Sequence, residues 1–174
     1  MTTTNAMLRD AFGHHNWASL VVLDACAGLT DEQLIATVPG VYGSILDTLR
    51  HLVEADVWYL HTLTDPRVPT IDESTMRVAE LRAEMALNGP RWHAFLEREL
   101  DPAQDVAFGN SIGETHAPMG IRVAQVLHHG TDHRSQVCTI LTALGIAPPS
   151  IDLWDFAQLD GRLVDVALAE APAS

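Results

Sequence analysis

The sequence predicts an all-helical (all-α) protein folded as a four-helix bundle. Four long segments place apolar residues three and four positions apart, as the buried face of an amphipathic helix requires, and turn residues separate these segments. A strand-like pattern occurs only once, just before the last long segment, and no internal repeat indicates a solenoid. A length of 174 residues suits one well-filled core. We therefore expect residues 1–174 to form a single domain of four packed helices.

The first two helices are bounded by recognisable signals. The first runs roughly from Asn5 to Ala27, and the segment from Gly28 to Leu34 (GLTDEQL) closes it with a short acidic turn. Ser44 is a suitable N-cap for the second helix, ILDTLRHLVEADVWYLHTL. Asp65 and Pro66 end that helix, because proline cannot continue the hydrogen-bonding pattern.

The third helix begins near Thr70 or Ser74 and continues through MRVAELRAEMALNGPRWHAFLEREL. Pro90 lies in the middle of this segment. An interior proline costs a helix about 3 kcal/mol, since it removes one backbone donor and clashes with the preceding turn. We therefore predict a kink or a break at Pro90.

The pattern changes between Asp101 and Met119, where Gly, Asn and Ser separate two short runs in DVAFGNSIGETHAPM. These runs predict a short β-hairpin before the last long helix. That helix extends roughly from Met119 to Leu144, and Gly145 ends it. A shorter helical tail is expected from Asp152 onwards.

Composition argues against several partners. Asp and Glu outnumber Lys and Arg by 23 to 10, which gives a formal net charge of −13, and such a charge repels nucleic acid and anionic membranes. No window approaches the ~20 apolar residues of a spanning helix, and the N-terminus lacks the apolar stretch of a signal peptide. Cys26 and Cys138 belong to no CxxC-type motif and are expected in the core. We expect a cytoplasmic protein that acts on a small molecule.

Two of the histidines are spaced to bind one ion. His129 and His133 are four residues apart in LHHGTDHRSQV, so on a helix their Cβ atoms lie about 5 to 6 Å apart on one face. That face also carries Val126, Gln136, Val137, Ile140 and Leu144, which marks it as the inward one. His128 is turned about 100° away, with Asp132, Ser135 and Thr139, and is not expected to be a ligand.

The second helix supplies a third histidine. His51 shares a stripe with Thr48, Ala55 and Trp58, so it borders the bundle interior among small neighbours that leave room for an ion. His61 lies elsewhere on this helix, near its end, where a solvated cation is expected. Three histidines without a carboxylate leave a coordination position open, as in catalytic rather than structural zinc sites. We predict that His51, His129 and His133 bind one divalent metal ion.

Other side chains near the predicted ion are weaker candidates. Gln136 lies on the metal face and is our candidate for a substrate contact. Arg134 is turned about 100° from His133, so we expect a salt bridge or a dimer contact rather than a catalytic role. Trp17 and Trp58 are expected to pack in the core. The remaining candidates are His15, Asn16 and Asp132.

The chain resembles the DinB-like (DinB/YfiT) family of proposed metalloenzymes over nearly its whole length. The resemblance includes FGHHNWASLVVLDACAGLTDEQL, the LRHLVEADVWYL helix and, most specifically, HHGTDHRSQVCTILTALGIAPP. The three metal histidines of the family correspond to His51, His129 and His133. The resemblance implies an up-down-down-up four-helix bundle, often a homodimer, that binds zinc or nickel. Members with assigned activities include thiol-dependent S-transferases, such as the bacillithiol S-transferases, and the mycothiol-dependent maleylpyruvate isomerase.

Several functions remain open on these residues. A divalent cation lowers the pKa of a coordinated low-molecular-weight thiol and so creates a nucleophile, which suits a thiol-dependent transferase or isomerase. A hydrolase would use the same open position to activate water. A non-catalytic bundle would instead bind a small ligand beside a structural or lost metal, and an interaction module would expose a large apolar patch.

Overall fold

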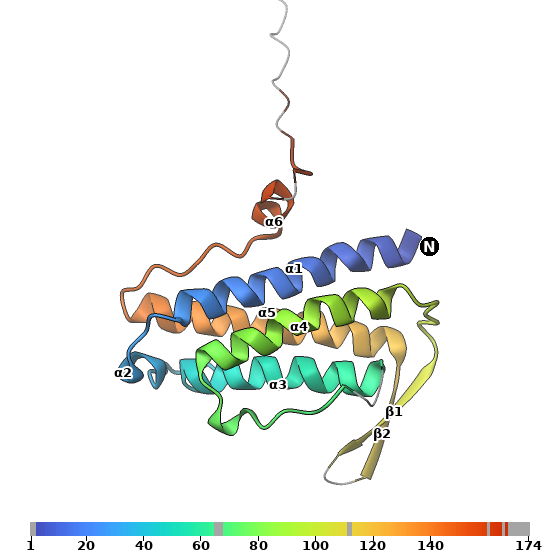
Figure 1. Ribbon diagram of the computed structural model, residues 1–174, viewed down its shortest axis with the longest axis horizontal. Coiled ribbons are helices and arrows are strands. Elements are labelled where there is room, and N and C mark those ends of the chain that lie inside the picture. The colour runs from blue at the N-terminus through green and yellow to red at the C-terminus, as the bar shows by residue number, and fades with distance from the viewer. Residues whose placement is uncertain (1–2, 65–67, 111–112, 160, 165, 167–174) are drawn as a thin grey trace, which may run out of the picture.

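The computed structural model describes residues 3–64, 68–110, 113–159, 161–164 and 166. Its four long helices are α1 (Thr3–Cys26), α3 (Ile45–Leu63), α4 (Val78–Leu96) and α5 (Met119–Ala143), and they lie side by side as a bundle (Figure 1). Helices α1 and α5 run in one direction, and α3 and α4 run in the opposite one (Figure 1). Both α1 and α3 pack against α4 and α5. The predicted up-down-down-up bundle is therefore confirmed.

Helix α3 follows its predicted boundaries closely. The Ser44 hydroxyl accepts a hydrogen bond from the Asp47 backbone N–H at 3.1 Å, as an N-cap should. The helix ends at Leu63, with Thr64 as its C-cap. Asp65 and Pro66, which were expected to end it, lie outside the described residues. Ahead of it, the acidic turn forms the short helix α2 (Asp31–Leu34), which begins with a capping box.

Helix α4 departs from the prediction at both its start and its middle. Ser74 belongs to a separate 3-10 turn, η1 (Glu73–Thr75), and α4 begins only at Val78, where the Glu80 carboxylate accepts a hydrogen bond from the Arg77 backbone N–H at 2.8 Å. The helix continues through Pro90 without interruption, so of the predicted kink or break the break is wrong, and the kink stays a prediction. The buried side chains of Met85 and Trp92 on either side of Pro90 supply packing that offsets the cost of the proline.

The predicted hairpin is present. Strands β1 (Asp105–Asn110) and β2 (Gly113–Pro118) pair antiparallel, with Asp105 opposite Pro118 and Phe108 opposite Thr115. Val106 is buried and Phe108 is partly buried, while most of the other described side chains of the hairpin are exposed. The hairpin is therefore held to the bundle by few side chains.

Helix α5 ends at Ala143 and is followed by Gly145, which has a φ of 73° and so favours the end of the helix. Leu144, predicted to face inward, is exposed because it caps the helix beyond its last turn. The predicted tail forms α6 (Leu153–Leu159), and Phe156 of this helix contacts Trp17 of α1 with ring centroids 5.6 Å apart.

Two apolar clusters fill the bundle. One contains Leu49, Met85 and Ile140, and the other, nearer the hairpin, contains Phe12, Trp92 and Val126. Cys26 is buried in the first cluster and Cys138 packs against it, and both are free thiols. Burial and, to a smaller extent, the neighbouring Cys138 together raise the pKa of Cys26 to about 12. The expectation of a core residue is confirmed for Cys26, whereas Cys138 is only partly buried at the edge of the core.

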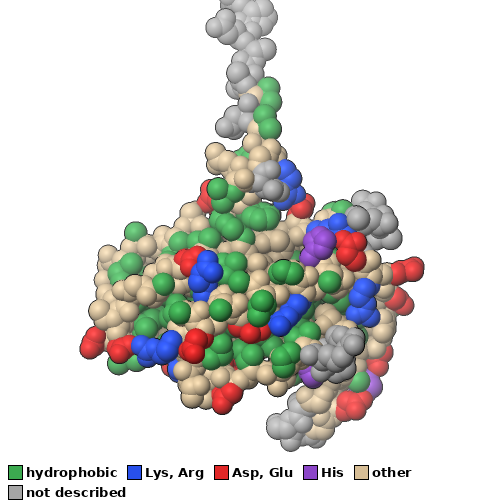
Figure 2. All heavy atoms as spheres, viewed as in Figure 1, with side chains coloured by type: hydrophobic (Ala, Val, Ile, Leu, Met, Phe, Trp, Pro, Cys, Tyr) green, Lys and Arg blue, Asp and Glu red, His purple; other side chains and the backbone are tan. Residues whose placement is uncertain are grey.

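The surface is mixed in character. On the face shown in Figure 2, acidic and basic side chains are scattered among apolar ones and do not gather into a single patch. Among the described residues, no helix combines the length and apolar character needed to cross a membrane.

Candidate metal centre

Three imidazoles from two helices converge between α3 and α5. His51 comes from α3, and His129 and His133 come from successive turns of α5; one ring nitrogen of each lies within 4.8 Å of the others. The Nε2 atoms of His51 and His129 are 3.0 Å apart. Two nitrogens bound to one metal ion, each at about 2.0–2.1 Å, would be separated by about 2.9–3.4 Å. The three histidines predicted from spacing therefore lie close enough together to hold one ion.

The hydrogen bonds of Gln136 determine which nitrogen of His133 carries a proton. The Gln136 Oε1 atom lies 3.2 Å from the Tyr42 backbone N–H and 3.0 Å from Nδ1 of His133. A backbone N–H can only donate, so the amide atom facing Tyr42 is the oxygen, and Nδ1 of His133 must donate to it as well. The Nε2 atom of His133 then keeps its lone pair free for a metal ion.

Tyr42 covers one side of the histidine cluster. Its ring stacks on His51, with centroids 4.4 Å apart and planes 9° apart, and it meets His133 edge-on at 5.1 Å. Tyr59 of α3 meets His129 at 5.9 Å. Sequence reasoning missed Tyr42 because it lies in the loop before α3, where no helical period indicates its direction.

The surroundings of His51 and His129 favour their neutral form, which is the form that binds metals. Burial lowers the pKa of His51, and the neighbouring His133 lowers it further. Burial lowers the pKa of His129 to about 4, together with the nearby His133 and His51. Near pH 7 both rings are unprotonated and offer lone pairs without first losing a proton.

A cavity of about 350 Å³ opens beside His51. It is lined by Tyr42, Asp47, Arg50, His51, Glu73 and Ser74. Most of these side chains are polar or charged, which suits a small polar molecule. Of the three histidines, His51 is the one that lines this cavity.

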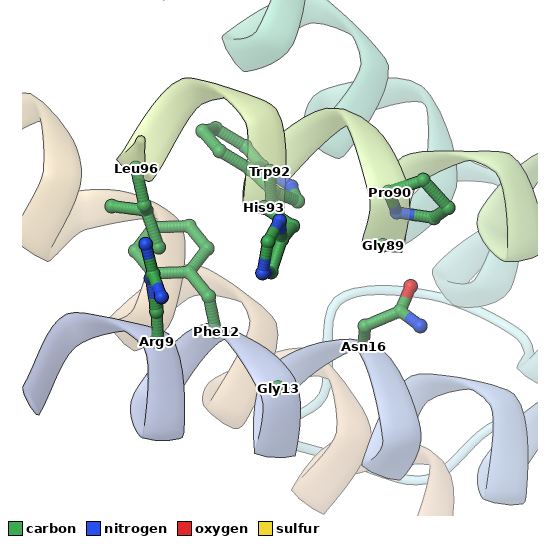
Figure 3. A pocket seen from close by; sticks show the side chains of 9 residues that line it. All are labelled: Arg9, Phe12, Gly13, Asn16, Gly89, Pro90, Trp92, His93 and Leu96. Atoms are coloured by element: carbon green, nitrogen blue, oxygen red, sulfur yellow. The ribbon is translucent and has the colours of Figure 1, made fainter. Parts of the chain in front are cut away.

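A second cavity, of about 400 Å³, lies between α1 and α4, away from the histidine cluster (Figure 3). Its walls include Phe12, Asn16 and Trp92 and none of the three histidines. Asn16, considered as a residue near the ion, therefore lines a different cavity. Of these two cavities, only the smaller is lined by one of the three histidines.

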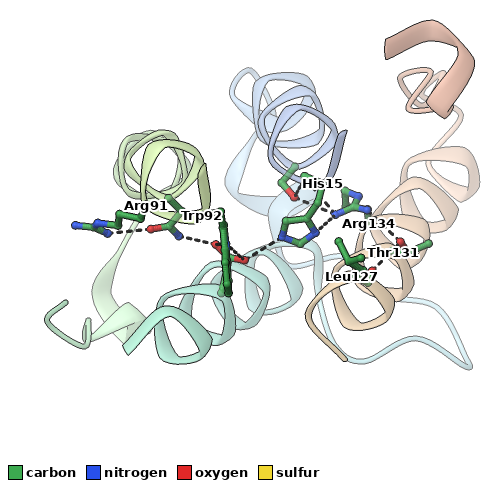
Figure 4. A network of polar contacts seen from close by, with 9 residues as sticks. His15, Arg91, Trp92, Leu127, Thr131 and Arg134 are labelled. Atoms are coloured by element: carbon green, nitrogen blue, oxygen red, sulfur yellow. Dashed lines mark hydrogen bonds and ion pairs between the residues drawn. The ribbon is translucent and has the colours of Figure 1, made fainter. Parts of the chain in front are cut away.

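A buried polar network connects all four long helices (Figure 4). Arg134 donates to Nδ1 of His15 at 3.1 Å, and since a guanidinium only donates, Nε2 of His15 carries the proton and donates to Asp56 at 2.9 Å. Asp56 also accepts from Trp92 at 3.1 Å and from Asn88 at 2.8 Å. Burial lowers the pKa of Arg134 to about 10. The network fixes α1, α3 and α5 relative to one another.

This network shows what two of the sequence candidates do. His15, considered as a residue near the ion, has both ring nitrogens engaged by Arg134 and Asp56. Arg134 is 2% exposed and is therefore no dimer contact, and its guanidinium reaches a carboxylate only through His15. The residue type gave no sign of burial, because arginine is usually exposed.

The remaining candidates lie outside the cluster. His128 and Asp132 are exposed, as the helical phase predicted. Trp17 packs beside Phe156 and Trp58 beside Phe108, and both tryptophans are partly buried. His61, expected as a solvated cation, instead lies with its Nδ1 atom 2.7 Å from the Val68 carbonyl, because the chain after α3 folds back over it.

Comparison with known proteins identifies a family. A family model described as the DinB family matches residues 1–163. No curated protein sequence matches the chain.

Proposed function

Because the chain belongs to the DinB family, we propose that His51, His129 and His133 hold a zinc or nickel ion in the active site of a metal-dependent enzyme. The observation that supports this proposal most is the convergence of three imidazoles without a fourth protein ligand. Among the described residues, no carboxylate or thiolate joins the group. A site with three protein ligands leaves a position open for a substrate, whereas a structural site is closed by a fourth.

The reaction we propose is a thiol-dependent S-transfer or isomerisation. A divalent cation at this site would supply the positive charge that lowers the pKa of a bound thiol. The chain's own residues have separable roles. Gln136 holds His133 in the tautomer that a ligand requires, Tyr42 covers the His51 ring, and Arg50 and Ser74 offer polar contacts to the small molecule in the cavity.

Gln136 was our sequence candidate for a substrate contact. Its side-chain oxygen accepts hydrogen bonds from His133 and from the Tyr42 backbone N–H, which supports a role in positioning His133. We therefore propose Gln136 as a positioning residue.

Metal content tests the site directly. Purified wild-type protein is compared with His51→Ala, His133→Ala and, as a matched control, His128→Ala, since His128 is an exposed histidine on the same helix. We expect close to one zinc or nickel ion per chain in the wild type and in His128→Ala, and loss of the ion in the other two variants. Protein that takes up no metal after reconstitution would refute the proposal.

Cobalt substitution tests the reaction class. A thiol such as 2-mercaptoethanol added to the cobalt-loaded wild type should produce a sulfur-to-cobalt charge-transfer absorption band. A loaded protein that gives no such band, yet hydrolyses activated esters, would favour the hydrolase. The homodimer implied by the resemblance is a separate proposal, which sedimentation velocity tests.

A further inference from the structure

Arg122 is a buried cation on the face of α5 that carries His129. Arg122 is 3% exposed. It lies in the first turns of α5, seven positions before His129. One terminal nitrogen donates to the Thr62 hydroxyl of α3. The Nε atom and the other terminal nitrogen are buried without a hydrogen-bond partner. Two of the donor nitrogens of this guanidinium are therefore free to receive an acceptor.

Three aromatic rings surround the Arg122 guanidinium. Its central carbon lies 3.9 Å from the ring centroid of Phe108, 4.9 Å from that of Trp58 and 5.6 Å from that of Tyr59. These rings attract the cation through their faces. The two free nitrogens nevertheless form no hydrogen bond to these side chains.

No acid of the described chain is paired with this cation. The ion pairs between described residues involve other arginines and histidines, although the chain carries a formal net charge of −13. Burying a charge is costly unless it is paired and hydrogen-bonded. An anion delivered by a ligand would remove this cost and fill both free donors.

We propose that Arg122 binds a carboxylate of the substrate, so that the site acts on small molecules carrying an anionic group. This inference rests on the proposed function for the reacting end of the molecule. His129 lies seven positions after Arg122 on the helix, which is a rise of about 10.5 Å at about 1.5 Å per residue. Tyr59 contacts both side chains and links the two positions. The substrate would then carry its carboxylate about 10 Å from the atom that reacts.

The hairpin covers the Arg122 position. Phe108 belongs to β1 and meets Trp58 edge-on at 5.4 Å, so the guanidinium lies beneath the hairpin. An isolated two-stranded hairpin is only marginally stable, and few side chains hold this one to the bundle. Lifting the hairpin exposes Arg122, and closing it surrounds a bound carboxylate with aromatic rings.

The test follows the Arg122 Nε–Hε resonance by NMR in metal-free protein. Hexanoate is titrated at constant ionic strength, and hexanamide serves as the neutral probe of the same shape. The resonance of Arg82, an exposed arginine paired with Asp24, is the internal control. We expect a saturable shift of Arg122 with hexanoate, at least tenfold weaker binding of hexanamide, and no shift of Arg82.

Variants provide a second measurement through the Trp58 indole N–H resonance. Arg122→Met should weaken hexanoate binding at least tenfold, and the wild-type titration decides the question alone if that variant fails to fold. Asp65 lies outside the described residues, so Asp65→Asn tests it as an internal counter-ion. The proposal would be overturned by a large shift of the Arg122 Nε–Hε resonance in the ligand-free Asp65→Asn variant. Equal binding of hexanoate and hexanamide would overturn it as well.

The outcome is separable from that of the proposed function. Carboxylate binding is measured without metal, and the thiol band is measured without a carboxylate. A thiol band with no Arg122 response would leave the metal enzyme standing and refute the carboxylate site. An Arg122 response in a protein that binds no metal would support the carboxylate site and refute the metal enzyme.

Discussion

Replacing Gln136 with methionine should weaken metal binding without unfolding the bundle. The substitution keeps the length of the side chain and removes the oxygen that accepts from His133 at 3.0 Å and from the Tyr42 N–H at 3.2 Å. The Nδ1 proton of His133 then loses its acceptor, and the ring is free to rotate or to change tautomer. Loss of such a partner behind a metal-binding histidine costs about 10–100-fold in affinity, or about 1.4–2.7 kcal/mol.

Competition with a chromophoric zinc chelator measures this effect, and circular dichroism checks that the variant is folded. Gln125→Met is the matched control, because Gln125 is an exposed glutamine on the same helix. Gln136→Glu keeps an oxygen acceptor and should retain most of the affinity. A zinc Kd for Gln136→Met within twofold of the wild-type value, or an equal loss in Gln125→Met, would refute the role assigned to Gln136.

Three further predictions concern the stability and reactivity of the fold. In Gly130→Ala the new Cβ would lie 2.3 Å from Cε1 of His15, so the contacts of His15 with Arg134 and Asp56 must break. We expect the free energy of unfolding, measured in urea, to fall by about 2–5 kcal/mol, after allowing for about 1 kcal/mol of gained helix propensity. Metal-free protein should lose stability, on the order of 2 kcal/mol, as the pH falls from 6.5 to about 4, because unfolded His129 takes up a proton that the folded, partly buried ring does not. Cys26 should react with a thiol reagent only after unfolding, since its pKa is raised to about 12.

Each of these predictions has a matched comparison. If Gly130→Ala unfolds at the same urea concentration as the wild type, His15 can move without a cost in stability. Metal-free His129→Gln should show a flatter dependence of stability on pH, and an unchanged profile would assign the effect to other groups. A Cys138→Ser variant isolates Cys26, and rapid labelling of that folded variant would contradict its burial.

The sequence predicted those parts of the fold that depend on helical periodicity and capping. Helix α3 and the histidines of α5 were placed correctly because apolar residues recur there with the period of an α-helix. The interruption at Pro90 was predicted from local cost alone. Packing of Met85 and Trp92 outweighs that cost, and such tertiary contacts are not visible in the local sequence.

The parts of the site that sequence reasoning missed depend on contacts between distant segments. Tyr42 reaches the cluster from a loop, and the role of Gln136 depends on the backbone N–H of that loop. His15 was one of the residues considered near the ion. Only the packing of three helices shows that Asp56 and Arg134 engage both of its ring nitrogens.

The polar groups of the interior differ in whether the chain itself completes them. In the network around His15, the carboxylate of Asp56 receives hydrogen bonds from three side chains. Both terminal nitrogens of Arg134 donate, and its Nε atom alone has no partner, so the chain completes most of this network. On the face between α3 and α5, by contrast, three imidazoles converge on one another and Arg122 keeps two buried donors free. Converging ring nitrogens and an unpaired buried cation both cost stability. A fold retains such features where a ligand completes them, so this face, rather than the larger cavity between α1 and α4, is where metal and substrate should be sought.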